Sequence, residues 1–261
     1  MFQTIEKVVS EFKELSREYF IRIITHYDTD GITAAAILSK ALQRQDKKFS
    51  VTVVKQLTED FLKRLKVEIE KKTKQVIVFL DLGSGHLDML RELNIPIFIL
   101  DHHEIENEDK IEEYRNSKNI KFVNPLLFKE EVSAAGLAYL FAKMLDPENK
   151  DTASLAIIGM VGDMLEQSIS KINNSIIKDA SELTIKRGPL IFSATRPINK
   201  ALEFGSGIFI PGVTGSSAGS IALLKDAGIR RENGRYPSMI ELTQEEISRL
   251  ITEIMLKRLN L

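Results

Sequence analysis

The histidines and aspartates of this 261-residue chain are placed where they could bind metal ions together. All four histidines lie in or beside short acidic segments that follow apolar runs: Thr25-His26-Tyr27-Asp28-Thr29-Asp30-Gly31, the stretch from Asp81 to His86, and Asp101-His102-His103. Imidazole and carboxylate together form the ligand set of Mn2+, Zn2+ or Fe2+. A carboxylate-rich site that holds two ions can activate water against a phosphate ester. These residue types therefore predict a metal site with hydrolytic chemistry.

The aspartates also have structural interpretations. One carboxylate of the first segment could be the N-cap of a helix that begins at residue 32, with Gly31 giving the freedom to turn. A cap needs one carboxylate, whereas Asp28 and Asp30 are two, and in an extended backbone they would project to the same side. Asp81 could cap a following helix with nearly equal weight. Two adjacent imidazoles directly after a strand are the more specific signal.

Asp163 is a further candidate metal ligand, whereas His86 is a weaker one. Asp163 follows an apolar, small-residue segment over 152–162, and a buried carboxylate requires a partner, which a metal ion would provide. His86 is the least specific of the four histidines and is interpreted as a helix-entry or outer residue.

The elements that would position these residues alternate along the first half of the chain. Apolar runs predict strands at 20–24, 49–54, 76–80, 97–100 and 120–123, and amphipathic or small-residue patterns predict helices at 3–18, 32–38, 58–72, 86–93 and 133–145. This alternation predicts an α/β fold, a parallel sheet with helices on both faces. Sites in such sheets form beyond the carboxyl ends of the strands, where every acidic motif of this chain falls.

The C-terminal part has a mainly helical pattern. It is helical from 164 to 203 with a break at Gly188-Pro189, loop-like over 204–214, and helical again over 217–228 and 243–260. We therefore expect a core domain over residues 1–165 and a mainly helical extension over residues 166–261 that packs on it.

Composition excludes several classes of protein. The chain has 36 basic and 37 acidic residues, so it lacks the overall positive charge of nonspecific duplex binders, and a nucleic acid would need a local groove. It has no cysteine, which excludes disulfides and thiolate metal sites. Its first residues carry charges where a signal peptide would be apolar, and no apolar run reaches membrane-spanning length, so we expect a cytoplasmic protein without membrane association.

The acidic motifs, taken together, resemble those of the DHH phosphoesterase superfamily. The segment from Thr25 to Gly31 is similar to its first motif, Leu80-Asp81 to the second, Asp101-His102-His103 to the signature that names it, and Gly159 to Asp163 to the fourth. The resemblance covers residues 20–165. Within the superfamily the chain most resembles the archaeal RecJ-like nucleases, including the GINS-associated branch, on the basis of residues 210–215 and the acidic helix after Leu242.

The resemblance implies a set of ligands. One metal ion would be held by His26, Asp28 and Asp81, and a second by Asp30, Asp81, His102 and Asp163, so that Asp81 bridges the two. Asp101 and His103 would support the site by orienting ligands or contacting the scissile phosphate. The ion that such relatives prefer is Mn2+, with Mg2+ or Co2+ as alternatives.

The resemblance also implies a domain that this sequence does not supply. Family nucleases usually continue into a DHH-associated domain with a Gly-Gly-His-type motif that grips the substrate, and this chain has no histidine after His103. We therefore expect that domain to be absent and its clamp to be provided by a dimer mate or a separate chain.

The leading hypothesis for function is a metal-dependent phosphodiesterase, a RecJ-like exonuclease that hydrolyses single-stranded DNA or RNA in replication or repair. Two alternatives remain open. The same chemistry would serve a small-substrate phosphohydrolase acting on short oligonucleotides, cyclic dinucleotides or pyrophosphate. The chain could also be a non-catalytic scaffold subunit of a replicative helicase, with GINS-type proteins as partners.

Basic residues after the fourth motif could line a substrate path, because grooves for single strands follow the phosphate backbone with positive charge. They are Lys186, Arg187, Arg196, Lys200, Arg230, Arg231 and Arg235. We select Arg196, Arg230 and Arg231, with His103, as candidate substrate-binding residues; ordinary surface cations are an equally good interpretation of each arginine.

Overall fold

The computed structural model describes residues 1–70, 74–165, 169–183, 189, 192 and 194–259. The chain divides into two compact units, Met1–Leu183 and Thr184–Leu261. Each unit has its own hydrophobic core.

The first unit is built on a parallel sheet. In the described residues it has five strands in the order β2-β1-β3-β4-β5, and their bounds are β1 Phe20–His26, β2 Phe49–Val54, β3 Gln75–Leu80, β4 Ile97–Leu100 and β5 Ile120–Val123. Every residue of the central strand β3 is buried, as expected of a parallel strand covered on both faces. The predicted α/β architecture is therefore confirmed.

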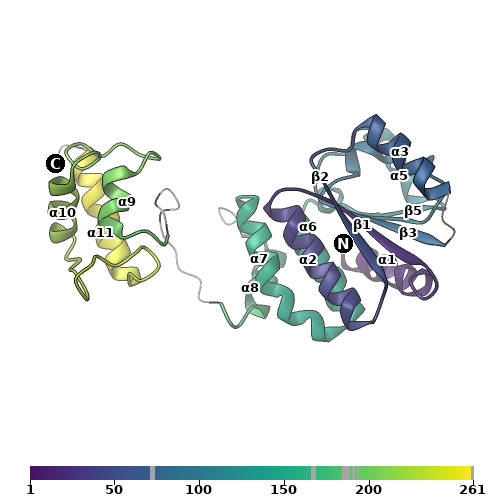
Figure 1. Cartoon of the computed structure of the whole chain (residues 1–261), viewed down its shortest axis with the longest axis horizontal. Coiled ribbons are helices and arrows are strands. Elements are labelled where there is room, and N and C mark those ends of the chain that lie inside the picture. The colour runs from purple at the N-terminus through teal and green to yellow at the C-terminus, as the bar shows by residue number, and fades with distance from the viewer. Residues whose placement is uncertain (71–73, 166–168, 184–188, 190–191, 193, 260–261) are drawn as a thin grey trace. The chain divides into compact units, whose positions relative to one another are not determined.

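Helices cover both faces of this sheet (Figure 1). Alternate residues of β3 point to opposite faces: Val76 and Val78 join the core beneath one set of helices, and Ile77 and Phe79 join the core beneath the other. The first set is α1 (Phe2–Leu15), α2 (Thr29–Arg44), α6 (Ala134–Leu145) and α7 (Ala153–Gly162); the second is α3 (Glu59–Glu70), α4 (Leu87–Arg91) and α5 (Ile111–Arg115).

Small residues let α2, α6 and α7 approach one another closely. A Cβ atom placed on Gly159 of α7 would lie only 2.4 Å from the Cβ of Ala135 in α6 and 2.7 Å from Thr33 Oγ1 in α2. A Cβ on Gly162 would lie 2.7 Å from the Cβ of Thr29. These contacts bring the end of α7 and the start of α2 to the carboxyl edge of the sheet.

The first unit extends beyond the predicted domain boundary after residue 165. Helix α8 (Lys171–Asp179) packs against α7, and its buried Ile172 and Ile176 belong to the core beneath α6 and α7. The division between the units therefore falls after Leu183. The packing of the C-terminal segment on the core domain stays a prediction.

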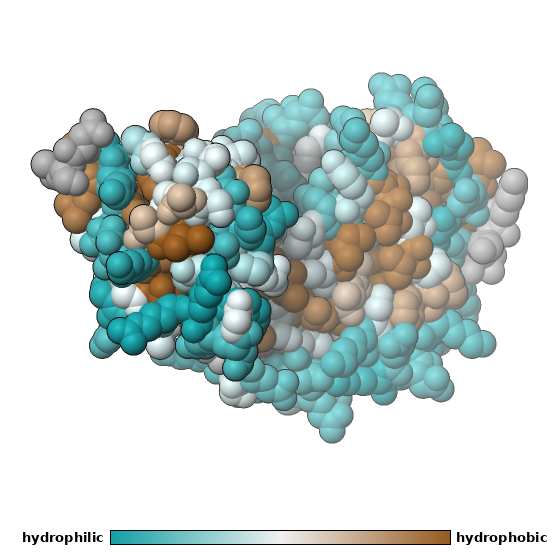
Figure 2. All heavy atoms as spheres, turned by 60° about the vertical axis from the view of Figure 1, so that its left-hand side comes forward, coloured by the Kyte–Doolittle hydropathy of each residue, from teal (hydrophilic) through white to brown (hydrophobic). Residues whose placement is uncertain are grey.

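The second unit is helical and has a separate core. Its described helices are α9 (Ile198–Phe204), α10 (Ser217–Asp226) and α11 (Gln244–Arg258). The pattern predicted a helical run over 164–203 with a break at Gly188-Pro189, but the described residues there form α-helix only in α8 and α9. Figure 2 shows apolar patches between hydrophilic residues on the face of this unit that it brings forward, and Phe209 and Met255 are among its exposed apolar residues. Across the described part of the chain, no helix combines the length and the apolar character needed to cross a membrane.

Candidate metal centre

The predicted site residues come together at the carboxyl ends of three neighbouring strands. His26 is the last residue of β1, Asp81 follows β3, and the segment Asp101 to His103 follows β4. Asp163 reaches the same place from the end of α7, where it is the C-cap residue.

The first cluster of potential ligands is formed by His26, Asp28 and Asp81. The Nδ1 atom of His26 lies 2.8 Å from Asp28 Oδ2 and 3.4 Å from Asp81 Oδ2. One ligand atom from each residue falls within 4.8 Å of the other two, close enough for a single cation to contact all three.

Asp28 is both a helix cap and a member of this cluster. Its Oδ1 accepts a hydrogen bond from Gly31 N at 3.0 Å and caps α2, while its Oδ2 faces His26. Helix α2 begins at Thr29 rather than at residue 32, so Asp28 and Asp30 do not share an extended segment as predicted. Asp30 instead reaches the site from the first turn of the helix.

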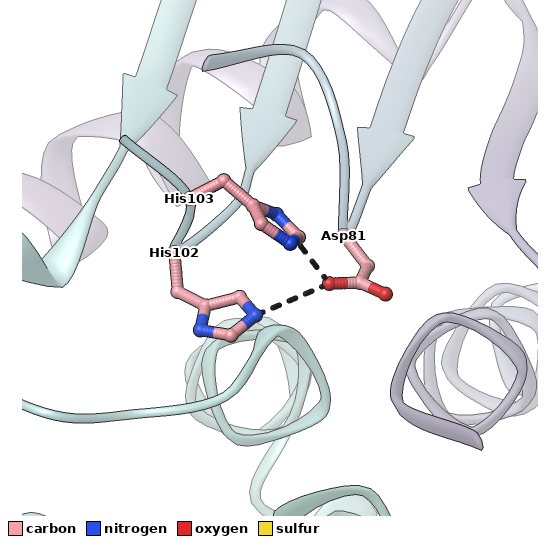
Figure 3. A group of neighbouring side chains, drawn as sticks. All are labelled: Asp81, His102 and His103. Atoms are coloured by element: carbon pink, nitrogen blue, oxygen red, sulfur yellow. Dashed lines mark ion pairs between the residues drawn. The ribbon is translucent and has the colours of Figure 1, made fainter. Parts of the chain in front are cut away.

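The second cluster contains Asp30, Asp81, His102 and Asp163. The Nε2 atom of His102 lies 3.0 Å from Asp163 Oδ2, 3.3 Å from Asp81 Oδ1 and 3.8 Å from Asp30 Oδ2. Figure 3 shows the imidazoles of His102 and His103 both directed at the Asp81 carboxylate. Asp81 therefore belongs to both clusters, and its role as a bridging ligand stays a prediction.

Asp30 is held in place by the start of another helix. Its side chain is completely buried, and its two oxygens accept hydrogen bonds from Ala134 N at 2.6 Å and Ala135 N at 2.9 Å in the first turn of α6. Gly159 leaves the space that this carboxylate occupies, because a Cβ there would lie 2.4 Å from Asp30 Oδ1.

Asp81 is buried in an environment that disfavours its charged form. It is 2% exposed, its backbone is in the left-handed region with φ of 59°, and within the described residues neither carboxylate oxygen has a hydrogen-bond partner. His26 Nδ1 and Asp163 Oδ2 are likewise buried without a hydrogen-bond partner there, although other members of the site lie within 3.0 Å of each. Strained backbone and unsatisfied polar atoms concentrate at functional sites.

His103 forms a third group of potential ligands with Asp81 and His102, and its ring is oriented by Asp101. Its Nδ1 is 2.7 Å from Asp101 Oδ1, which also accepts from the backbone N–H groups of His102 at 2.8 Å and His103 at 3.2 Å. Asp101 is fully buried and His103 is half exposed. Asp101 thus supports the site from within the core, and the His103 ring is accessible to solvent.

The electrostatics of the site reflect an excess of carboxylates. Burial, together with the Asp81 and Asp163 carboxylates, raises the pKa of Asp30 to about 7. Burial also raises the pKa of Asp81, and the nearby Asp28 adds to this effect. Burial would lower the pKa of His102, but the Asp163 and Asp81 carboxylates outweigh it and raise that pKa to about 10. Without another cation, protons must compensate the negative charge.

The donor set fits divalent metal ions. Buried carboxylate oxygens with no hydrogen bond, raised carboxyl pKa values and imidazole nitrogens at contact distance are what a site for a hard or borderline cation requires. A divalent ion in each cluster would provide the missing partner for Asp81 and remove the need for protons on Asp30 and His102.

Several predicted residues lie outside these clusters. His86 ends a short 3₁₀ helix, Ser84–His86, and precedes α4. The exposed Arg196, Arg230 and Arg231 belong to the second unit, and their role in substrate binding stays a prediction. Arg231 lies over the ring of Tyr236. Lys186 and Arg187 fall outside the described residues.

Sequence reasoning missed two buried residues that support the site, Ser84 and Asn124. Asn124 directly follows β5, as Asp101 follows β4, so its position at a strand end was the available signal. Its Nδ2 donates to His103 O at 2.7 Å and to Ser84 Oγ at 3.0 Å.

Comparison of the sequence with known families gives two matches. The N-terminal domain of the DHH family matches residues 20–160, and the DHH-CID domain matches residues 191–260. An uncharacterised protein of Methanocaldococcus jannaschii is 31% identical over 262 residues, which cover 97% of this chain and 57% of that protein. The chain thus spans little more than half the length of this relative.

Solved structures share the fold at low sequence identity. RecJ from Thermus thermophilus in complex with Mn2+ is 20% identical with a TM-score of 0.53, and the match covers 98% of this chain and 37% of that one. CDC45 from Entamoeba histolytica is 18% identical with a TM-score of 0.62, and the match covers 97% of this chain and 56% of that one.

Proposed function

Because the chain belongs to the DHH family, we propose that it is a two-metal phosphodiesterase that hydrolyses single-stranded nucleic acid from an end. The observation that carries this proposal is Asp81, a buried carboxylate shared by two ligand clusters, with no hydrogen bond to either oxygen among the described residues. His26 and Asp28 would hold one divalent ion with it, and Asp30, His102 and Asp163 the other. Bound in this way, such ions lower the pKa of a water and neutralise charge that develops on the phosphoryl oxygens. Mn2+ is the ion we propose, with Mg2+ or Co2+ as alternatives.

The protein's own residues supply orientation and a proton. Asp101 accepts from Nδ1 of His103, and no described residue makes a hydrogen bond with Nε2 of the same half-exposed ring, so Nε2 could contact a phosphoryl or leaving oxygen. The Asp101 carboxylate raises the pKa of His103, which favours the protonated ring. His103 would therefore donate a hydrogen bond to the substrate, and Asp101 would hold the ring in that orientation.

Tyr27 favours a nucleotide over pyrophosphate as the substrate. It lies between His26 and Asp28, is 55% exposed, and meets the His26 ring edge to face at 4.8 Å between centroids. An exposed aromatic ring next to a phosphate-cleaving site offers a base a surface for stacking, worth about 1–3 kcal/mol. Pyrophosphate has no group that could use this surface.

The test is hydrolysis of labelled single strands by the purified chain with Mn2+. We expect shortening from one end, and loss of this activity in Asp81→Ala and Asp163→Ala. Asp109→Ala is the matched control, because Asp109 is an exposed carboxylate outside the ligand clusters. Turnover that survives either active-site change would refute the metal assignment.

Substrate length separates the remaining hypotheses. A strand of about 20 nucleotides should be cleaved faster than dinucleotides if the chain follows single strands through a groove. The reverse ranking would indicate a small-substrate phosphohydrolase. Absence of hydrolysis with every divalent ion, together with co-purification of a GINS-type protein, would indicate a scaffold. We place the proposed activity in DNA replication or repair on the basis of the RecJ-like motifs.

A further inference from the structure

Asn124 connects the loop after β5 to the loops that carry the site. It is 1% exposed, and its side chain makes three hydrogen bonds: Nδ2 donates to His103 O at 2.7 Å and to Ser84 Oγ at 3.0 Å, and Oδ1 accepts from Leu126 N at 3.0 Å. The orientation of the amide is determined by its partners, because the backbone N–H can only donate and the backbone carbonyl can only accept.

Asp101 completes the connection. Its Oδ2 accepts from Ser84 N at 2.8 Å, and its Oδ1 accepts from the backbone N–H and the Nδ1 atom of His103. The loops after β3, β4 and β5 are therefore joined by Ser84, Asp101 and Asn124, and His103 is held by both its backbone and its ring.

We propose that Asn124 is a positioning residue that fixes His103 for the reaction. The kinetic part of this inference rests on the proposed phosphodiesterase function. A half-exposed histidine on a loop would otherwise sample several orientations, and outer residues that orient a reacting group change activity by about 10–100-fold when they are removed. Asn124 contacts none of the proposed metal ligands through the hydrogen bonds given above, so its loss should change turnover and leave metal affinity intact.

A simpler role for Asn124 makes a different prediction. Asn124 is the N-cap residue of the short 3₁₀ helix Pro125–Phe128, and its Oδ1 accepts the capping hydrogen bond from Leu126 N. Capping requires only this acceptor. Asn124→Asp keeps that acceptor and the shape of the side chain but removes both N–H donors. A residue that only caps would tolerate aspartate, whereas a residue that holds His103 O would not.

The chain offers a matched control in Asn173. This asparagine is also fully buried, and its Nδ2 donates to a backbone carbonyl, that of Glu131, at 2.9 Å, but it lies in α8. Asn173→Asp therefore makes the same chemical change in the same unit without touching His103.

The experiment measures kcat and KM, Mn2+ affinity by calorimetry, and the His103 imidazole resonances of the metal-free protein by NMR. For Asn124→Asp we expect kcat to fall by about 10–100-fold, Mn2+ affinity to stay within about twofold, and the His103 resonances to shift while those of His26 do not. Asn173→Asp should change neither kcat nor the histidine resonances. Asn124→Ser, which keeps a capping hydroxyl but is too short to reach His103 O, should behave like Asn124→Asp and serves if the aspartate variant does not fold.

Unchanged kcat and unchanged His103 resonances in Asn124→Asp would overturn the inference and leave Asn124 a helix cap. Loss of Mn2+ affinity would overturn it as well, because Asn124 would then act on the metal ligands. If the unmodified protein hydrolyses nothing, the proposed function fails, and the resonances of His103 still decide whether Asn124 holds it.

Discussion

The environment of Asp81 lowers the stability of the metal-free protein. Its backbone has a left-handed conformation that is uncommon for residues other than glycine, and its carboxylate is buried between Asp28, Asp30 and Asp163 with no hydrogen bond from the described residues. The four carboxylates outnumber the two imidazoles, His26 and His102, that lie within 3.4 Å of Asp81, so burial of the excess negative charge destabilises the metal-free protein. A divalent cation in the site would remove that cost.

We expect Asp81→Asn to stabilise the metal-free protein by about 1–2 kcal/mol, because the substitution removes a buried charge among like charges. Mn2+ at about 100 times its Kd should stabilise the unmodified protein by about 2.7 kcal/mol and the variant not at all. Chemical denaturation with EDTA and with Mn2+ measures both effects, and Asp109→Asn should change neither. A variant less stable than the unmodified protein in EDTA would contradict this account.

At the residue scale, the sequence indicated the candidate ligands more readily than the residues that support them. Aspartates and histidines that follow apolar runs can be identified directly from the sequence. A cap role and a ligand role for Asp28 do not exclude each other, because Oδ1 caps α2 while Oδ2 faces His26. The position of Asn124 after a strand was a signal, but its role and that of Ser84 depend on β3, β4 and β5 being neighbours in space, which the sequence does not show.

At the scale of elements, the strands were predicted closely and several helix ends were not. A buried parallel strand such as β3 is a short continuous apolar run, which periodicity and length identify well. Helix α2 begins three residues before the predicted start, because Asp28 is its cap and the acidic motif continues into its first turn. The pattern over 164–203 is helical in composition, but its described residues form only two short helices.

The close packing of α2, α6 and α7 leads to a prediction for Gly159. We expect Gly159→Ala to destabilise the protein by about 1–3 kcal/mol, because the added Cβ would lie 2.4 Å from both Asp30 Oδ1 and Ala135 Cβ. Mn2+ affinity should fall as well, since Asp30 must move. Urea denaturation and calorimetry measure these effects. Gly85→Ala, which has no heavy atom within 4 Å of the new Cβ, should be nearly neutral, and equal effects at the two positions would refute the packing argument.

A second prediction concerns the contact between α6 and α8. Asp179 of α8 accepts from Tyr139 Oη at 2.7 Å and pairs with Lys143 and Lys150; burial opposes its ionisation, but these partners lower its pKa to about 2. A lowered pKa gives stability that is present above the unfolded value near 4 and is lost as the pH falls through 2.

Asp179→Asn should therefore cost about 1–2 kcal/mol at neutral pH and almost nothing at about pH 1, below both the folded and the unfolded pKa. Urea denaturation of both proteins across this range measures the difference. A cost that does not change with pH would mean that the ion pairs are not its source.

At the scale of the whole molecule, the chain combines a unit with all the candidate ligands and a second helical unit with its own core. The alternation of strands and helices predicted the first unit, and the loss of that alternation predicted a change of architecture after it. The compact first unit also includes α8, because this amphipathic helix packs against α7, a pairing that the sequence pattern does not indicate.

The second unit allows a test of nucleic-acid binding. We expect a triple change of Arg196, Arg230 and Arg231 to glutamine to weaken binding of single-stranded DNA by about tenfold and to reduce its salt dependence, if these arginines contact phosphates. Binding titrations at several salt concentrations measure both effects. The control is the same charge removal at Lys225, Lys257 and Arg258 of that unit, and equal weakening by both sets would show that only net charge matters.

The two oxygens of Asp30 that cap α6 bear on how such a protein could change over evolutionary time. A lineage that no longer needed hydrolysis would gain stability by replacing Asp81, whereas replacing Asp30 would leave two backbone amides of a central helix without acceptors. An aspartate at position 30 in a distant descendant would then show only that the fold had been kept. The residue at position 81 would indicate whether the metal site had been kept as well.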